Sequence, residues 1–414
     1  MSDQSIEPTT PRDRVRTGMR RWFRTPPRQH GEVDYGREVS FLELFYDLVY
    51  VVVIGQAAHH LAEHVGWQGV ADFAIVFGLI FFVWFNGTLW HELHGREDGR
   101  SRLYIFGQMG LITLLAVFAG DATGDDGPAF ALVYTAVFLL LTWQWYVVHR
   151  TDEDPRYRPT TTRYVGGMLL SVAAMAASAF VGESVRFWIW VALVVGWSIV
   201  GVVLPTTSRT EGYGDAVSAS LVERFGLVTI IVLGEVVIGV VAGIGDVADR
   251  DAMTIAVGIL GLGIGMGIWW NYFDLLGRRV PTQGGGRLAG WMSAHLPMTM
   301  AIAAAGAAMV SLVEHAGDGR TPAATAWLLG ASVAVVLAGI ALASRALSTD
   351  EFPDGMARHI VPTFTVAAVL VLAVAALRPA PVVLVVGIDV VLLLTWLWLF
   401  VVFLARGGAE VGTK

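Results

Sequence analysis

The chain has 414 residues, of which 55% are hydrophobic and 15% are charged, and its mean hydropathy is +0.60. Soluble globular domains carry about 25% charged residues, so this composition excludes an ordinary soluble protein and indicates a membrane protein. The absence of cysteine excludes disulfide bonds and thiolate chemistry. The formal charge of −7 says little about partners, and the positions of the charges carry more information.

Residues 1–38 form a basic tail that lacks the apolar core of a signal peptide. Its cations are Arg12, Arg14, Arg16, Arg20, Arg21, Arg24, Arg28 and Arg37. One interpretation is a disordered cytoplasmic arm that fixes topology. The other is that Met19 to Phe23, with Trp22 and Phe23 among arginines, lies on the anionic leaflet, where each basic residue contributes about 1 kcal/mol.

Twelve apolar stretches of about 18 to 25 residues follow, each long enough to cross the roughly 30 Å hydrocarbon core as a helix. They predict an all-α polytopic membrane protein with about 12 transmembrane helices. We place these spans at residues 39–60, 68–91, 102–120, 128–149, 160–181, 185–204, 216–242, 251–276, 288–312, 322–345, 358–377 and 381–404.

Charges in the loops predict the orientation. With the N-terminus inside, 23 of the 28 lysines and arginines fall on the cytoplasmic side and four on the outer side. By the positive-inside rule, both termini, including the short tail 406–414, are expected in the cytoplasm and the chain in the plasma (inner) membrane.

Similar segments recur in the same order in the two halves of the chain, 39–212 and 213–405. They pair FLELF from Phe41 with LVERF from Leu221, VIGQ from Val53 with VLGE from Val232, Trp84-Phe85-Asn86 with Trp269-Trp270-Asn271, and Arg102-Leu103 with Arg287-Leu288. Six spans return the chain to its starting side, so these matches predict a parallel 6+6 repeat about an axis along the membrane normal.

Four segments also form a recognisable set of motifs. They are FLELFYDLVYVVVIGQAAH from Phe41, ERFGLVTIIVLGE from Glu223 to Glu235, HLP from His295 to Pro297, and Leu312-Val313-Glu314. Together they resemble the bacterial low temperature requirement protein A (LtrA) family over roughly residues 37–405. The resemblance implies a multi-pass membrane protein, transfers no catalytic role, and indicates only which residues to suspect.

Two carboxylates open the first span, Glu43 and Asp47, four residues apart on one helical face. An ionised side chain inside hydrocarbon costs at least about 2.5 to 3.5 kcal/mol, so it is expected to face a partner or a polar path. Arg224, beside Glu223 at matching depth in the seventh span, is the expected cation. These four residues either form an ion-pair cluster that locks the repeats together or take part in transport or proton relay.

Glu235 lies in the outer half of the seventh span, with no basic residue at that depth in its own span. It is the best single candidate for a protonatable or cation-binding group, and the alternative is a protonated carboxyl with one interhelical hydrogen bond. Asn86, Asn271 and His295 are further polar groups inside spans. Pro297, just after His295, predicts a broken helix at a pathway.

The histidines at the outer end of the first span suggest a second kind of site. His60 to His64 fit H-x-x-E-H, the inverted zinc-protease motif, which places His60 and His64 on one helix face. A zinc site needs a third protein ligand, and Glu314 at the outer end of the ninth span could supply it. The alternative is a polar cap at the membrane interface.

The function that these patterns favour is a secondary transporter of ions or small solutes rather than an enzyme. Its path is predicted to involve Glu43, Asp47, Asn86, Glu223, Arg224, Glu235, Asn271 and His295. The alternatives are a membrane-embedded enzyme that acts on a lipid or apolar substrate at the outer His and Glu site, and a structural or regulatory protein without flux. We expect no cofactor and no nucleic acid. The expected partners are the lipid bilayer and an unidentified solute or ion, and a homo-oligomer is compatible with the sequence.

Overall fold

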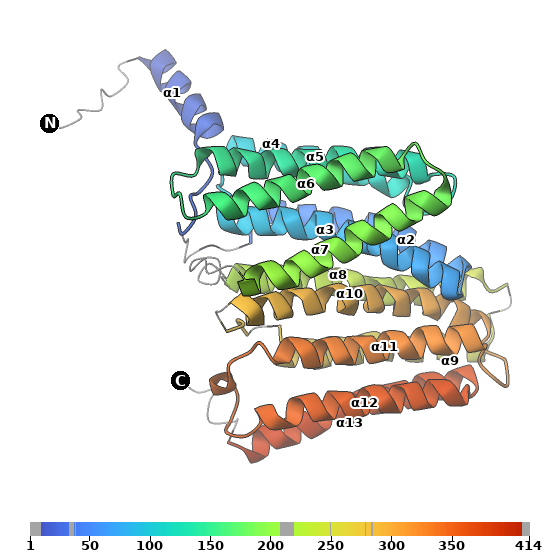
Figure 1. The fold of residues 1–414 in the computed structure, drawn as a ribbon. Helices are drawn as coiled ribbons and strands as arrows, with labels where there is room; N and C mark the ends of the chain where they lie inside the picture. Colours follow the sequence, from blue (N-terminus) through green and yellow to red (C-terminus); the bar gives the residue numbers. More distant parts are fainter. Residues whose placement is uncertain are drawn as a thin grey trace.

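The computed structural model describes residues 10–32, 37, 39–207, 219–248, 250–277, 279–282 and 285–407. All regular elements in these residues are helices (Figure 1). They are α1 (Pro11–Arg24), α2 (Phe41–Glu63), α3 (Trp67–His94), α4 (Gly99–Val117), α5 (Gly127–Thr151), α6 (Arg158–Ser178), α7 (Glu183–Thr207), α8 (Ala219–Asp246), α9 (Ala252–Leu275), α10 (Gly285–Glu314), α11 (Ala323–Ser344), the 3-10 helix η1 (Thr349–Glu351), α12 (Ala357–Leu377) and α13 (Pro381–Ala405).

Ten helices in the described part of the chain are long and apolar enough to cross a membrane, namely α2, α3, α5 and α7 to α13. The prediction of an all-α polytopic membrane protein is therefore confirmed. The predicted third and fifth spans correspond to α4 and α6, which run beside the others in Figure 1. They are less apolar because α4 contains Arg100 and Arg102, and α6 contains Arg158 and Arg163.

The same pattern of helix packing occurs twice along the chain. In the first half, α2 packs against α3 and α4, α3 against α5 and α7, α5 against α4 and α6, and α6 against α7. In the second half, α8 packs against α9 and α10, α9 against α11 and α13, α11 against α10 and α12, and α12 against α13. Each of these helix pairs in the first half thus corresponds to a pair in the second half whose helix numbers are six higher.

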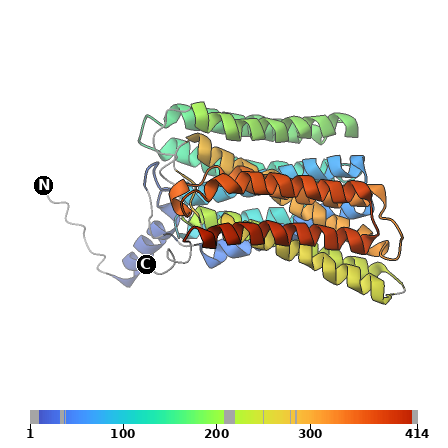
Figure 2. The same cartoon turned by 90° about the horizontal axis from the view of Figure 1, so that it is seen from below.

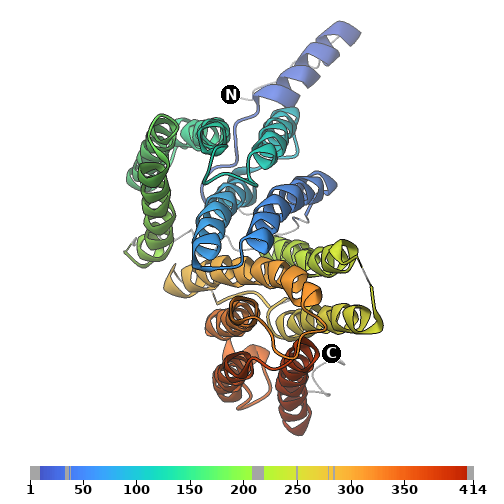
Figure 3. The same cartoon turned by 90° about the vertical axis from the view of Figure 1, so that its right-hand side faces the viewer.

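Helix α10 joins the two halves. It has 30 residues and stays helical through Pro297, so the expectation of a broken helix there is wrong. It packs against α8 and α11 of its own half and against α2, α3 and α7 of the other. Viewed along the bundle, α10 accordingly lies between the two groups of helices (Figure 3).

The residues after α1 lie against the helix ends. The main-chain N–H of Arg28 donates to the carbonyl of His94 at 3.0 Å, and the Gln29 side chain donates to the carbonyl of Thr151 at 3.1 Å. Residues 25–32 thus cross the ends of α3 and α5. This part of the tail is a packed segment rather than the disordered arm that one interpretation of the sequence proposed.

Helices α8 and α10 approach closely at two glycines. A Cβ on Gly239 would overlap the main-chain oxygen of Gly306, and a Cβ on Gly306 would lie 2.5 Å from the carbonyl carbon of Glu235. Small residues permit this kind of main-chain contact between membrane helices.

We therefore expect Gly306→Ala to destabilise the protein by about 1 to 3 kcal/mol, because the added methyl group forces the two main chains apart. Thermal unfolding in detergent measures the effect. Gly234→Ala is the matched control, since no atom lies within 4 Å of the Cβ it would add. Equal melting temperatures for the two variants would contradict the close contact.

Candidate functional site

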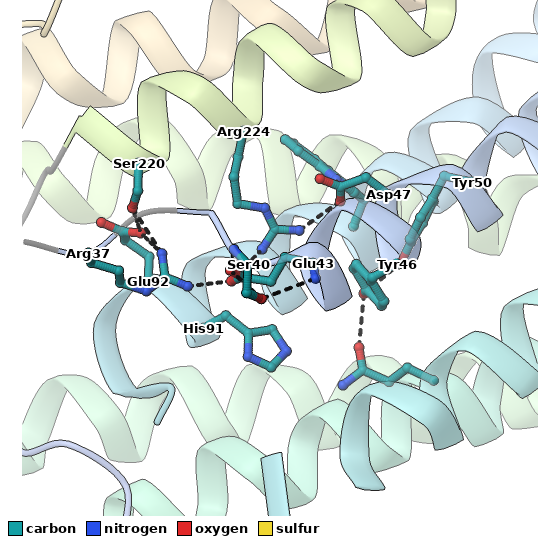
Figure 4. Close-up of polar contacts among 12 residues, drawn as sticks. Arg37, Ser40, Glu43, Tyr46, Asp47, Tyr50, His91, Glu92, Ser220 and Arg224 are labelled. Atoms are coloured by element: carbon teal, nitrogen blue, oxygen red, sulfur yellow. Dashed lines mark hydrogen bonds and ion pairs between the residues drawn. The ribbon is translucent and has the colours of Figure 1, made fainter. Parts of the chain in front are cut away.

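A cluster of buried charged side chains lies where the starts of α2 and α8 meet the end of α3 (Figure 4). At its centre, Nη2 of Arg224 donates to Oδ1 of Asp47 at 2.7 Å. The Arg224 side chain is 0% exposed and that of Asp47 is 1% exposed. This ion pair links α8 of the second half directly to α2 of the first.

A tryptophan from a third helix completes the contact with Asp47. Trp84 of α3 donates its indole N–H to the same carboxylate oxygen, Oδ1, at 2.9 Å. The other oxygen, Oδ2, is buried and has no hydrogen-bond partner among the described residues. A buried acceptor without a donor is costly, so Oδ2 is the atom of Asp47 that is left free to accept a proton or a cation.

Glu43 is part of the same cluster and also begins α2. One of its oxygens lies 3.5 Å from Nη1 of Arg224 and is paired with Arg37 as well. Its other oxygen accepts from the main-chain N–H of Ser40 at 3.0 Å. The hydroxyl of Ser40 accepts in turn from the N–H of Glu43, which gives a capping box.

Arg37 extends the cluster to α3 and to the start of α8. Its guanidinium donates to Glu92 at 2.6 Å and to the hydroxyl of Ser220 at 2.9 Å. Ser220 donates to the same Glu92 oxygen at 2.6 Å. The cluster therefore ties together the residue before α2, α2 itself, α3 and α8, as Figure 4 shows.

A row of buried polar side chains leads from this cluster to α4 and α5, through one cation–π contact and then hydrogen bonds. The guanidinium carbon of Arg224 lies 5.8 Å from the centre of the Tyr46 ring. Tyr46 bonds to the hydroxyl of Tyr50 at 2.8 Å and donates to Gln108 at 2.9 Å. Gln108 donates to Gln144 at 2.8 Å. These polar side chains are fully buried, and they connect the charged cluster to α4 and α5 of the first half.

Glu235 lies deeper in α8, on the same face as Arg224, because 11 residues are close to three helical turns and span about 16 Å. Its side chain is buried, and Oε1 has no hydrogen-bond partner among the described residues. A Cβ on Gly55 of α2 would lie 3.4 Å from this oxygen. The carboxyl group therefore lies between the two halves, against a glycine of the helix that carries Asp47.

His295, Asn86 and Asn271 lie in separate helix contacts. His295 bonds to Tyr272 at 3.0 Å and to the carbonyl of Trp291 at 2.7 Å. Asn86 of α3 accepts from Tyr164 of α6. Asn271 of α9 donates to the carbonyl of Leu392 of α13 at 3.2 Å. The predicted path residues are thus distributed over several seams between helices.

Glu223 lies outside the charged cluster. It is exposed on α8, whereas its neighbour Arg224 is fully buried. Successive residues on a helix point about 100° apart, so burial of Arg224 turns Glu223 away from α2.

The predicted metal ligands do not gather into one site in the described residues. The rings of His60 and His64 stack at 4.4 Å, and Glu314 is exposed near the end of α10. In the part of the chain that the structure describes, no three His, Asp or Glu side chains are grouped so that they could hold a metal ion. The geometry gives the zinc hypothesis no support.

Sequence reasoning did not assign Arg37, Trp84, Glu92 and Ser220 to the site. For Arg37 a local signal existed, because Ser40 and Glu43 match the capping-box spacing and predict that the chain turns into α2 just after this arginine. The other three come from helices far away in the sequence, where no local pattern indicates a contact with α2.

Comparisons with known proteins identify a family for nearly the whole chain. The family described as bacterial low temperature requirement A protein matches residues 38–404. An uncharacterized protein of Rhizobium meliloti (strain 1021) is 26% identical over 212 residues, which cover 49% of this chain and 50% of that protein. The match thus spans about half the length of the curated relative. No solved structure matches.

Replacing Arg224 by glutamine should destabilise the protein by about 3 to 5 kcal/mol, because it leaves the Asp47 carboxylate buried without its cation. The change is measured by heating the protein and determining, by size-exclusion chromatography, the fraction that remains folded. Glu223→Gln, one residue earlier on the exposed face, is the control and should change stability by no more than about 0.5 kcal/mol. Similar effects of the two substitutions would show that Arg224 is not the buried partner of Asp47.

Proposed function

We propose that this chain, which belongs to the bacterial low temperature requirement A protein family, is a secondary transporter of ions or small solutes. Two groups of helices, α2 to α7 and α8 to α13, move relative to each other around the seam between α2, α8 and α10. Glu235 is the group that binds a proton or a cation, and the cluster of Asp47, Glu43 and Arg224 closes one end of the seam.

The position of Glu235 is the observation that carries this proposal. An isolated carboxylate inside a membrane helix is costly and usually marks an ion pathway or a proton relay. Glu235 is buried between α2 and α10, and no hydrogen bond to its Oε1 is found in the described residues. A purely structural carboxyl group would be expected to donate or accept a hydrogen bond across the helix contact.

The ion-pair cluster supports the proposal that a contact near Arg224 closes one end of the seam. This cluster lies on the same face of α8 as Glu235. Arg224 and Asp47 come from different halves and are joined by one short hydrogen bond. A proton or cation that neutralised Asp47 would weaken the link to Arg224 and let the two halves separate at this end. Glu235 lies about three turns deeper on α8 than Arg224. Binding at Glu235 and opening of the contact between Asp47 and Arg224 therefore affect the same pair of helices, α2 and α8.

Duplication of a six-helix unit accounts for the two-fold pattern of packing. The correspondence between helix pairs of the two halves supports it, as does the matching position of Asn86 and Asn271 on α3 and α9. Both units begin at the same end of the bundle, so the proposed repeat is parallel, with 12 membrane-spanning helices that include α4 and α6.

We infer that the charged cluster lies at the cytoplasmic end of the bundle, because basic residues predominate in the loops and tails assigned to that side. The start of α2 and the end of α13 lie at this end (Figure 1), and the predicted topology puts 23 of the 28 lysines and arginines on the same side. Both termini are cytoplasmic, and the chain resides in the plasma membrane.

A structural or regulatory role without flux is the second candidate. The pairing of polar groups within separate helix contacts favours it, since His295, Asn86 and Asn271 each have hydrogen-bond partners on other helices. In that case Glu235 would matter only for the packing of α8.

Flux measurements on purified protein in liposomes distinguish the two candidates. We expect an imposed pH gradient to drive ion or solute flux that empty liposomes lack, followed with a pH-sensitive dye. Glu235→Gln should reduce this flux by about tenfold or more, because the amide can neither release a proton nor balance a cation.

Glu223→Gln is the matched control, because it makes the same change on the exposed face of the same helix. It should leave the flux unchanged. If folded protein gave no flux under any proton or cation gradient, the transporter proposal would be rejected in favour of the structural role.

A further inference from the structure

Helix α1 has an apolar face that the rest of the protein covers only in part. Val15, Met19, Trp22 and Phe23 follow the spacing i, i+4, i+7, i+8 and therefore lie on one side of the helix. Their side chains are 62%, 59%, 43% and 40% exposed. The hydroxyl of Thr10 caps the helix by accepting from the N–H of Asp13 at 3.2 Å, so the helix begins at a defined residue.

The remainder of α1 is strongly basic. The helix contains six arginines and a single acidic residue, Asp13. At 100° per residue, Arg14, Arg20 and Arg24 lie on the arc opposite Met19, and Thr17 lies between them. An apolar stripe beside an arginine-rich face is the pattern of helices that lie in the interface of a bilayer.

The place of α1 in the molecule fits the same partner. Trp22 and Phe23 lie against Gly99 at the start of α4, and the guanidinium carbon of Arg102 is 5.2 Å from the Trp22 ring centre. From this attachment α1 runs outward past the edge of the bundle, at the end where α2 begins (Figures 1 and 3). Figure 2 shows it beyond the ends of the long helices. In a bundle that spans a bilayer, the ends of the long helices lie at the level of the lipid headgroups.

We infer that α1 is a lipid-binding element, whose apolar face enters the headgroup region of the membrane while its arginines bind anionic headgroups. Charge complementarity favours an anionic lipid surface as the partner of α1. The arginines around the apolar stripe would strengthen membrane binding by attracting negatively charged lipids. The inference concerns a part of the chain distant from Glu235 and does not depend on the proposed transport.

A single fluorescent label tests this inference in the full-length protein, because the natural chain contains no cysteine. Met19→Cys places an environment-sensitive dye on the apolar face, and Thr17→Cys places it on the opposite arc as the matched control. Each labelled protein is inserted into nanodiscs of phosphatidylcholine alone or of phosphatidylcholine mixed with phosphatidylglycerol. Nitroxide-bearing lipids then report contact with the bilayer through quenching.

We expect a blue-shifted, quenched label at position 19 in the anionic nanodiscs and a weaker response at position 17. Changing Arg14, Arg20 and Arg24 together to glutamine should remove the dependence on phosphatidylglycerol, since each arginine changes the ratio of bound to free helix by about fivefold. Size-exclusion chromatography verifies that the variants remain folded.

Absence of lipid quenching at position 19, or equal quenching with and without phosphatidylglycerol, would overturn the inference. Shielding of the label that persists in detergent would overturn it as well, because it would identify a second copy of the chain as the partner of α1.

Discussion

The buried ion pair between Asp47 and Arg224 is the contact on which the arrangement of the two halves depends. Both side chains are almost completely excluded from solvent, so each charge needs the other, and losing one partner leaves an uncompensated charge. Trp84 and Glu43 surround the pair with further donors and acceptors. This requirement fixes the start of α2 against the start of α8 and positions α3 beside both.

The seam between the halves changes character along its length. At the end near Arg224 it is charged and hydrogen-bonded, and near Glu235 a glycine of α2, Gly55, faces the carboxyl group of Glu235. Polar contacts specify which helices meet, whereas glycine contacts allow helices to lie close without interlocking side chains. Glu235 lies in the second of these regions, which is why we propose it as the group that binds a proton or a cation.

The helical membrane fold could be predicted because hydropathy and helix length are local properties. The first predicted span, 39–60, corresponds to α2 at Phe41–Glu63. The sequence predicts Arg224 as the cation for Asp47, and the structure pairs the two. The prediction that Glu223 belongs to the same cluster is wrong, because α8 is apolar on all sides and its sequence does not reveal which face points inward. The contacts of Trp84 with Asp47 and of Glu92 with Arg37 join residues more than 30 positions apart, which no local pattern encodes.

The coupling energy between Asp47 and Arg224 tests the central claim most directly. It is obtained from the unfolding free energies of the natural protein, Asp47→Asn, Arg224→Gln and the double variant in one detergent. A direct buried pair predicts a coupling of about 2 kcal/mol or more, with the double variant more stable than the sum of the single effects implies. Additive effects of the two substitutions would contradict the claim that this ion pair holds the halves together.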